Sequence, residues 1–199
     1  MENLQAILAG IRPLNEGFLK QAQRKLDNLT KPRGSLGRLE EIARRYAAIK
    51  EDLNPSVTRK VIFTFAGDHG VVEEGVSAYP GQVTVQMVLN MLAGGAAVNV
   101  LAAQAGAEVV VVDIGVNHDF ESAPGLVVRK VGYGTKNFTK GPAMSREEAL
   151  QSIWVGIELA EEYAKGGMDI AGTGEMGIGN TTPSSAILSV LTGLPAEAV

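Results

Sequence analysis

The stretch that decides the fold is Val61-Ile62-Phe63-Thr64-Phe65-Ala66-Gly67-Asp68-His69-Gly70. Its first six residues form an apolar run, and such a run bounded by turn residues is typical of a strand buried on both faces. Gly67 and the polar residues after it end this strand in a loop. A second run of the same kind, from Glu108 to Ile114, ends at Gly115. Both runs predict central strands of a parallel sheet.

Helical patterns alternate with these strands. After the first strand we expect a helix from about Gly81 to Gln104 that weakens at Gly94-Gly95, and then a short apolar run over 126–131. A capping box at Ser145-Arg146-Glu147-Glu148 predicts the start of a helix that extends to about Lys165. A strand from Met168 to Ala171 and a helix from about Thr182 to Leu191 follow. This alternation predicts an α/β fold, a parallel sheet covered by helices. Ligands of such sheets bind beyond the carboxyl ends of the strands. We therefore expect a site built from the loops at 67–69, 113–115 and 172–175.

The first 50 residues carry a helical period instead. The period breaks at Pro13, and residues 30–37 form a loop in which Ser35 is the expected N-cap of a helix from Leu36 to Lys50. One face of that helix carries an apolar stripe, formed by Leu39, Ile42, Ala43, Tyr46 and Ile49. We expect an N-terminal helical segment over 1–57 and an α/β substrate-binding domain over 58–199.

Composition excludes several classes. The net charge of −4, without a basic stripe, argues against a nucleic-acid binder. The chain has no cysteine, so disulfides, thiolate zinc sites and a cysteine nucleophile are excluded. The apolar tracts near 83–103 and 107–116 are interrupted by Asn, Gly and Asp, which indicates buried core rather than a membrane span. The start of the chain lacks signal-peptide features, and we expect a cytoplasmic protein.

The most suggestive segment for chemistry is Asp169-Ile170-Ala171-Gly172-Thr173-Gly174-Glu175-Met176-Gly177-Ile178-Gly179-Asn180-Thr181-Thr182. It predicts a short strand, a glycine-rich turn that holds one carboxylate, and a helix start. Glycines allow close approach of a ligand, and helix-start amides favour phosphate. Glu175 would then act as a base or hydrogen-bond acceptor. The alternative is a tight strand-to-helix connection with Glu175 in solvent.

Other chemistries fit less well. Asp68, His69, Asp113, His118 and Asp119 could form a divalent-metal site on paper, but no metal-ligand spacing accompanies them, and hydrogen bonds that fix loops are favoured. The chain has no G-x-S-x-G motif and no Walker lysine. A G-x-G-x-x-G match at 172–177 stands alone near the end of the chain. We therefore expect neither a metal nor a cofactor.

Several motifs together resemble one family. They are Lys31-Pro32-x-Gly34-Ser35-Leu36-Gly37-Arg38-Leu39-Glu40, Ala66-Gly67-Asp68-His69-Gly70-Val71 with Glu74-Gly75-Val76 and Pro80, Asn99-Val100-Leu101-Ala102-x-x-Ala105-Gly106-Ala107, Asp113-x-Gly115, Gly141-Pro142-Ala143-Met144-Ser145, and Gly174-Glu175-Met176-Gly177-Ile178-Gly179-Asn180-Thr181-Thr182-Pro183. In this order they resemble the nicotinate-nucleotide–dimethylbenzimidazole phosphoribosyltransferases over nearly the whole chain.

The resemblance implies a pentosyltransferase, that is, a glycosyltransferase of cobalamin lower-ligand synthesis. Such an enzyme transfers phosphoribose from nicotinate mononucleotide to dimethylbenzimidazole, giving α-ribazole phosphate and nicotinate. The resemblance also implies a Rossmann-like sheet, a small helical domain to which 1–57 belongs, and a homodimer. It implies no cofactor, no nucleic-acid or membrane partner, and small-molecule substrates.

Site residues follow from the same resemblance. Glu175 matches a supporting catalytic glutamate at the benzimidazole pocket. The substrate-binding positions would be Gly174, Glu175, Met176, Gly177, Ile178, Gly179, Asn180 and Thr181, with Tyr79, Gln86 and Met87 as a pocket wall. Packing of Tyr79 onto its loop and exposure of Gln86 to solvent are equal alternatives. Asp68 and His69 are expected to shape their loop by hydrogen bonding.

Family members are much longer, and the resemblance places their principal base beyond Val199. We therefore expect an α/β domain incomplete at its C-terminus, with an unpaired sheet edge, and a chain inactive by itself. The helices over 18–50 would then be mobile or would pack on a second copy through Leu39, Ile42, Tyr46 and Ile49. The alternatives for function are a non-catalytic nucleotide- or azole-binding module and a metal-dependent phosphatase that uses Asp68 and His69.

Overall fold

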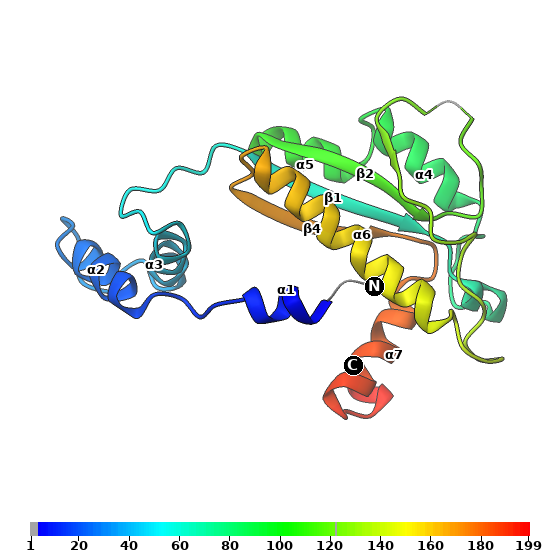
Figure 1. The fold of residues 1–199 in the computed structure, drawn as a ribbon. Helices are drawn as coiled ribbons and strands as arrows, with labels where there is room; N and C mark the ends of the chain where they lie inside the picture. The colour runs from blue at the N-terminus through cyan, green and yellow to red at the C-terminus, as the bar shows by residue number, and fades with distance from the viewer. Residues whose placement is uncertain (1–3, 122) are drawn as a thin grey trace. The chain divides into compact units, whose positions relative to one another are not determined.

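The computed structural model describes residues 4–121 and 123–199, and these divide into two compact units. The first unit ends at Ser56 and the second begins at Val57, whereas the sequence predicts the boundary between residues 57 and 58. Over residues 4–56 the regular elements of the first unit are all helices, and the second unit contains the sheet (Figure 1).

The second unit contains the parallel α/β sheet that the apolar runs predict. Its strands are β1 (Lys60–Gly67), β2 (Ala107–Gly115), β3 (Leu126–Val128) and β4 (Ile170–Met176). They pair in parallel in the order β3-β2-β1-β4. The two strands with continuous apolar runs are therefore central, because only central strands have both neighbours and both faces covered.

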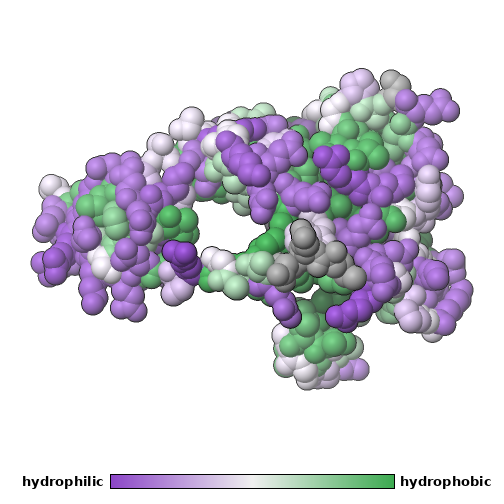
Figure 2. Space-filling model, in the orientation of Figure 1, coloured by the Kyte–Doolittle hydropathy of each residue, from purple (hydrophilic) through white to green (hydrophobic). Residues whose placement is uncertain are grey.

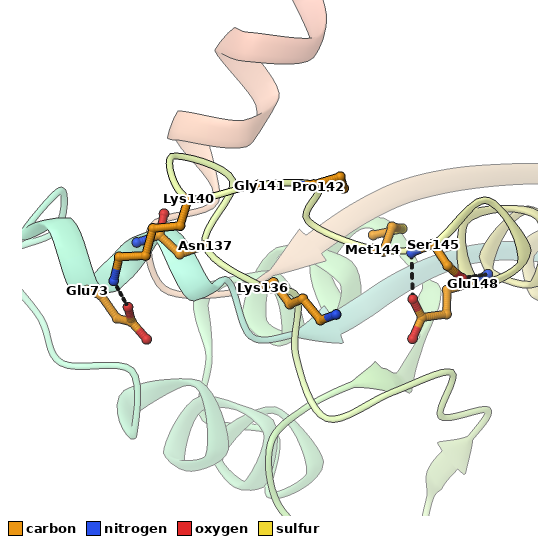
Figure 3. Close-up of a pocket in the computed structure, with 9 residues that line it drawn as sticks. All are labelled: Glu73, Lys136, Asn137, Lys140, Gly141, Pro142, Met144, Ser145 and Glu148. Carbon is orange, nitrogen blue, oxygen red and sulfur yellow. Dashed lines mark hydrogen bonds and ion pairs between the residues drawn. The ribbon is translucent and has the colours of Figure 1, made fainter.

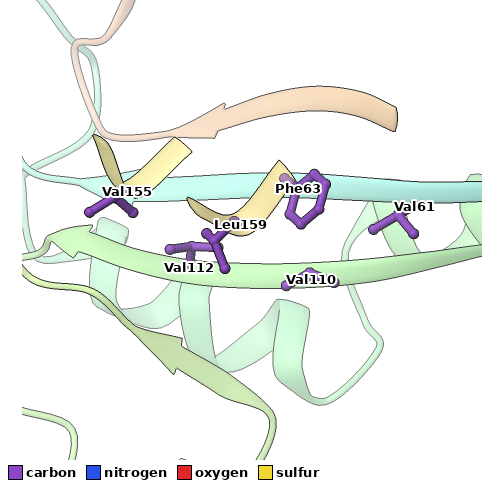
Figure 4. Close-up of a cluster of buried hydrophobic side chains, with 6 residues drawn as sticks. All are labelled: Val61, Phe63, Val110, Val112, Val155 and Leu159. Atoms are coloured by element: carbon purple, nitrogen blue, oxygen red, sulfur yellow. The ribbon is translucent and has the colours of Figure 1, made fainter. Parts of the chain in front are cut away.

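Helices cover both faces of this sheet. On one face, α6 (Arg146–Lys165) buries Val155 and Leu159 against β1 and β2, as Figure 4 shows; this cluster consists of Val61, Phe63, Val110, Val112, Val155 and Leu159. On the other face, Val88 and Met91 of α4 (Val83–Leu92) pack on Ala66 and Val111. The capping box predicted at Ser145 is confirmed, since its hydroxyl and the Glu148 carboxylate each accept the other residue's backbone N–H.

The apolar tract after β1 is interrupted as predicted. By length and composition, residues 83–105 could cross a membrane. The chain instead forms α4 and α5 (Ala97–Ala105), which are separated at Gly94-Gly95, where Gly94 has φ +78°. Each helix is shorter than the ~20 residues of a membrane span. The tract is only partly core, because Val88 is fully buried while Val100 and Leu101 are exposed.

The glycine-rich segment folds differently from the prediction. Strand β4 extends to Met176, so Gly172, Gly174 and Glu175 lie in a strand and not in a turn. A Cβ at Gly172 would lie 3.4 Å from Ile62 Cγ1, and one at Gly174 would lie 3.3 Å from Thr64 Oγ1. These glycines therefore let β4 approach the side chains of β1. The ladder to β1 extends the strand that sequence spacing had ended at Ala171.

Other elements complete the described part of the unit. They are the 3-10 turns η1 (Gly70–Glu74) and η2 (Ala196–Ala198) and the helix α7 (Thr181–Thr192). Strand β4 lies at one edge of the sheet. Helix α7 exposes Ile187, Val190 and Leu191, and Figure 2 shows apolar surface gathered at this end of the chain.

The first unit consists of α1 (Leu4–Gly10), α2 (Glu16–Asp27) and α3 (Arg38–Lys50). Helices α2 and α3 pack together and bury Ala22, Ala47 and Ala48. The apolar stripe of α3 is not the packed face, because Leu39, Ile42 and Ile49 are 58–64% exposed.

The predicted N-cap at Ser35 is wrong. Helix α3 starts at Arg38 after Gly37, whose φ of +55° favours glycine. The buried Glu40 carboxylate accepts hydrogen bonds from Lys31 Nζ (2.8 Å) and from the backbone N–H of Leu36 (3.1 Å). Glu40, and not a serine cap, therefore holds the loop before α3 through these two hydrogen bonds.

Candidate active site at the carboxyl ends of the sheet

The three strand ends expected to form a site do meet at one cavity. A cavity of about 250 Å³ is lined by residues of these ends and of the loops between β3 and α6; the strand-end residues are Gly67, Asp68, His69, Ile114, Gly115 and Glu175. Its volume lies just below the ~300–1,000 Å³ typical of small-molecule pockets. Sequence spacing missed Lys136 and Met144 of the loop before α6, and Glu148 in the first turn of α6.

Glu175 is held at the rim of this cavity by two side chains. Its Oε1 lies 3.0 Å from Nε2 of His69, and its Oε2 accepts a hydrogen bond from the side-chain amide of Asn180. The Glu175 side chain is 43% exposed. The alternative of Glu175 in solvent holds only in part, because the side chain is partly exposed while both carboxylate oxygens have a protein partner and the residue lines the cavity.

The loop that carries His69 is anchored on both sides. The Asp68 backbone N–H donates to Gly115, the Asp68 carbonyl accepts from the Thr135 N–H, and the Asp68 carboxylate accepts from the Asn117 N–H. The Gly70 N–H donates to the Thr135 hydroxyl. Asp68 thus shapes the loop as predicted, while the His69 ring contacts Glu175.

The turn between β4 and α7 uses several of its own amides. The N–H groups of Asn180 and Thr182 donate to the carbonyls of Gly177 and Gly179. The N–H of Ile178 donates to the hydroxyl of Thr84, at 3.1 Å. These three amides are therefore bonded within the protein, whereas the sequence predicted helix-start amides available to bind a phosphate. Asn180 makes no side-chain capping bond to α7, and its side-chain amide donates to Glu175.

Thr84 is a site-supporting residue that the sequence did not single out. Its side chain is fully buried between α4 and the turn. A threonine among the apolar residues of the inward face of α4 was the available signal, because a buried hydroxyl needs a partner.

The expected pocket wall is only partly assembled. Tyr79 is 65% exposed and lines a wider cavity of about 830 Å³, which shares Asp68 and His69 with the smaller one. Gln86 is exposed on α4, and Met87 packs against the buried cluster that includes Ala66, Val88 and Val111. Met176 points to that same cluster. The structure therefore brings Glu175, Asn180 and Tyr79 near His69, and it uses Met87 and Met176 in packing.

A further cavity of about 520 Å³ adjoins the site through shared residues (Figure 3). Lys140 donates to Glu73 at 2.7 Å, which raises the pKa of Lys140 and lowers the pKa of Glu73. Lys136 and Glu148 line both cavities. The backbone N–H of Ser145 lowers the pKa of Glu148, and the charge of Lys136 lowers it further. Lys136 therefore supplies positive charge to both cavities.

The residues considered for a metal site have separate partners. The Asp113 carboxylate pairs with Lys130 at 2.8 Å and accepts the Val116 N–H, while Asp119 accepts from Tyr133. The His118 ring packs edge-on against Phe120. Within residues 4–121 and 123–199, no three His, Asp or Glu side chains are grouped to hold a metal. Loop fixing, the alternative that the spacing favoured, accounts for these residues.

Comparison with known proteins matches the chain to one family. The family model described as phosphoribosyltransferase matches residues 11–199. The nicotinate-nucleotide–dimethylbenzimidazole phosphoribosyltransferase of Geobacter sp. (strain M21) is 62% identical over 193 residues, which is 97% of this chain and 55% of that protein. The protein of the same name from Geobacter sulfurreducens is 59% identical, covering 100% of this chain and 56% of that protein.

A solved structure has the same fold. The crystal structure of the enzyme of that name from Thermus thermophilus superposes with a TM-score of 0.89 at 47% identity, covering 94% of this chain and 56% of that one. The chain thus spans about half the length of the relatives that it matches.

Proposed function

The chain belongs to the phosphoribosyltransferase family, and from this premise we propose that the protein containing it transfers phosphoribose from nicotinate mononucleotide to dimethylbenzimidazole. The products would be α-ribazole phosphate and nicotinate, in the synthesis of the cobalamin lower ligand. The single observation that carries the proposal is the Glu175 carboxylate, which is fixed at the carboxyl end of the sheet beside a small cavity.

The reaction needs a proton acceptor for the azole. One azole nitrogen attacks C1′ of the ribose, and the bond from C1′ to nicotinate breaks with its electron pair leaving on nicotinate. The proton of the other azole nitrogen passes to a carboxylate base. Attack opposite the leaving group inverts the anomeric centre, and a nearby carboxylate stabilises the positive charge that develops at C1′.

Glu175 fits the supporting role in this scheme. Its two hydrogen-bond donors keep the carboxylate in place, and part of it remains exposed to accept a hydrogen bond from the azole. Lys136 offers positive charge to an anionic substrate from the facing loop. We assign the neighbourhood of Gly174 to Thr181, with Tyr79, Gln86 and Met87, to the substrates, and the principal base to the longer protein beyond Val199.

One experiment separates this function from its alternatives. The chain is assayed alone and after extension beyond Val199 with the corresponding part of the 62% identical Geobacter relative, with and without a chelator. We expect α-ribazole phosphate from the extended chain only. Turnover by the 199-residue chain would contradict a base beyond Val199. Binding of both substrates without turnover by the extended chain would favour a binding module, and chelator-sensitive phosphate release would favour a phosphatase.

We further propose that the protein is a cytoplasmic homodimer. The exposed stripe of Leu39, Ile42 and Ile49 on α3 supports the dimer, because apolar side chains at three positions of one helix face favour a partner.

A further inference from the structure

The contact between His69 and Glu175 joins the ends of two adjacent strands. His69 lies just after β1. Glu175 lies on the neighbouring strand β4, where it pairs with Phe65 of β1. Paired residues of a parallel sheet project to the same face, so Glu175 points to the side of Phe65 and the small cavity. The His69 side chain is 18% exposed and its Nε2 lies 3.0 Å from Glu175 Oε1.

The contact between His69 Nε2 and Glu175 Oε1 can serve as a hydrogen bond to the carboxylate. An ionised carboxylate only accepts hydrogen bonds, so in a pair with ionised Glu175 the donor is the Nε2–H of His69. Asn180 donates to the other oxygen in the same way. Two donors, one on each oxygen, restrict the rotation of the Glu175 side chain before any substrate binds. An acceptor held in one geometry binds its partner without paying ordering entropy at that step.

The backbone around the pair is built to hold it closed. Gly177 is buried, and a Cβ there would lie 2.6 Å from His69 Nε2 and 2.7 Å from Glu175 Oε1. The turn after β4 therefore folds directly over the contact, which only glycine permits. On the other side, Asp68 and Gly70 are tied to Asn117 and Thr135. His69 has little freedom to leave Glu175.

From this geometry we propose that His69 is a positioning residue that orients Glu175 for hydrogen bonding to the azole. The proposal rests on the proposed function, and it adds a role for a side chain that otherwise belongs to a loop. In this role His69 acts through Glu175, to which its Nε2 is hydrogen-bonded.

Spectroscopy on the 199-residue chain tests the contact independently of function. The chain has two histidines, and the ring of His118 packs on Phe120 and not on Glu175, so His118 is an internal control. We expect an Nε2–H resonance of His69 that exchanges slowly with water and is lost in Glu175→Ala, with His118 unchanged. The same His69 spectrum in the parent and in Glu175→Ala would overturn the proposal.

Calorimetry with dimethylbenzimidazole and with nicotinate mononucleotide tests the consequence. In His69→Phe the azole should bind about tenfold more weakly, which is the loss of one hydrogen-bonded group. His69→Gln, whose amide can donate from a similar place, should recover azole binding to within about threefold, and the nucleotide should change less than about twofold in both variants. Equal azole binding by the parent and His69→Phe would overturn the proposal. If the parent binds no azole, the azole site of the proposed function fails, and the spectrum alone decides the role of His69.

Discussion

The hydroxyl of Thr84 on α4 lies 3.1 Å from the backbone nitrogen of Ile178, in the turn that follows β4. Thr84 is fully buried, so this bond gives its hydroxyl a partner inside the protein and gives the Ile178 amide an acceptor. Through it, a helix on one face of the sheet sets the position of the turn that covers Glu175. Substitutions on α4 can therefore act on the site without touching a substrate.

Thr84→Val tests this support. The isosteric change should lower the free energy of unfolding by about 1–3 kcal/mol, because the Ile178 amide loses its acceptor inside the protein. Urea unfolding followed by fluorescence of the single tryptophan, Trp154, measures the change. Thr84→Ser keeps the hydroxyl and should lose less. Equal stability of the valine variant and the parent would mean that the amide finds another partner.

Glu175→Gln tests the acceptor role. In the extended, active chain the change should weaken azole use by about 1.5–3 kcal/mol, the range for a hydrogen bond to a charged group. Binding of nicotinate mononucleotide should change less. Steady-state kinetics with each substrate varied in turn separate the two effects. Glu161→Gln, an exposed position of α6, is the matched control. An unaltered specificity constant for the azole would assign Glu175 to structure alone.

Gly177→Ala tests the turn that covers the His69–Glu175 pair. An added Cβ would lie 2.2 Å from the Gly67 carbonyl oxygen, so the backbone must shift, at a cost of about 1–3 kcal/mol. Azole binding should fall with stability. Gly156→Ala is the control, because its Cβ would meet nothing within 4 Å and α6 should gain about 0.5–1 kcal/mol. Urea unfolding of both variants checks the opposite signs, and a neutral Gly177→Ala would contradict the close packing.

Glu40 predicts an acid-sensitive N-terminal unit. The hydrogen bond from Lys31 and the one from the Leu36 N–H hold the pKa of Glu40 below its usual 4.5. A carboxyl whose pKa is lower in the folded state adds stability above pH 4.5, and this stability is lost as the pH falls through the folded pKa. Amide exchange in α2 and α3, measured from about pH 6 downward to about pH 3, should show this loss.

The test and control variants for this pH dependence change two adjacent glutamates, Glu40 and Glu41. Glu40→Gln should flatten the acid limb of the exchange profile of α2 and α3. Glu41→Gln should leave it in place, because Glu41 pairs with the exposed Arg38 and Arg45 at the surface. The same acid limb in parent and Glu40→Gln would remove Glu40 as its source.

The stripe on α3 predicts self-association. Light scattering of the 199-residue chain should give a mass that rises with concentration toward that of a dimer. The double change Leu39→Glu and Ile42→Glu should return it to a monomer, since charge on an apolar contact is costly. Ile187→Glu on α7 tests the other exposed apolar surface. A monomer at every concentration, resistant to protease, would contradict association through α3.

Local signals in the sequence determined much of this protein. The apolar runs of β1 and β2 identified central strands, because burial on both faces demands them. The capping box determined the start of α6, since it satisfies amides that lie within four residues of it. The strand-to-helix alternation predicted the parallel sheet, and therefore also that the candidate site lies at the carboxyl ends of its strands.

Only the tertiary structure decided the rest, because it depends on groups far apart in the chain. Strand β4 continues through Gly172 and Gly174 because β1 supplies a ladder that no neighbour in sequence reveals. The pairing of His69 with Glu175 joins positions 106 residues apart. The buried face of α3 follows from the packing of this helix on α2, which buries Ala47 and Ala48 and leaves the hydrophobic stripe exposed. Sequence spacing placed the carboxylate near the site, and long-range packing decided what holds it there.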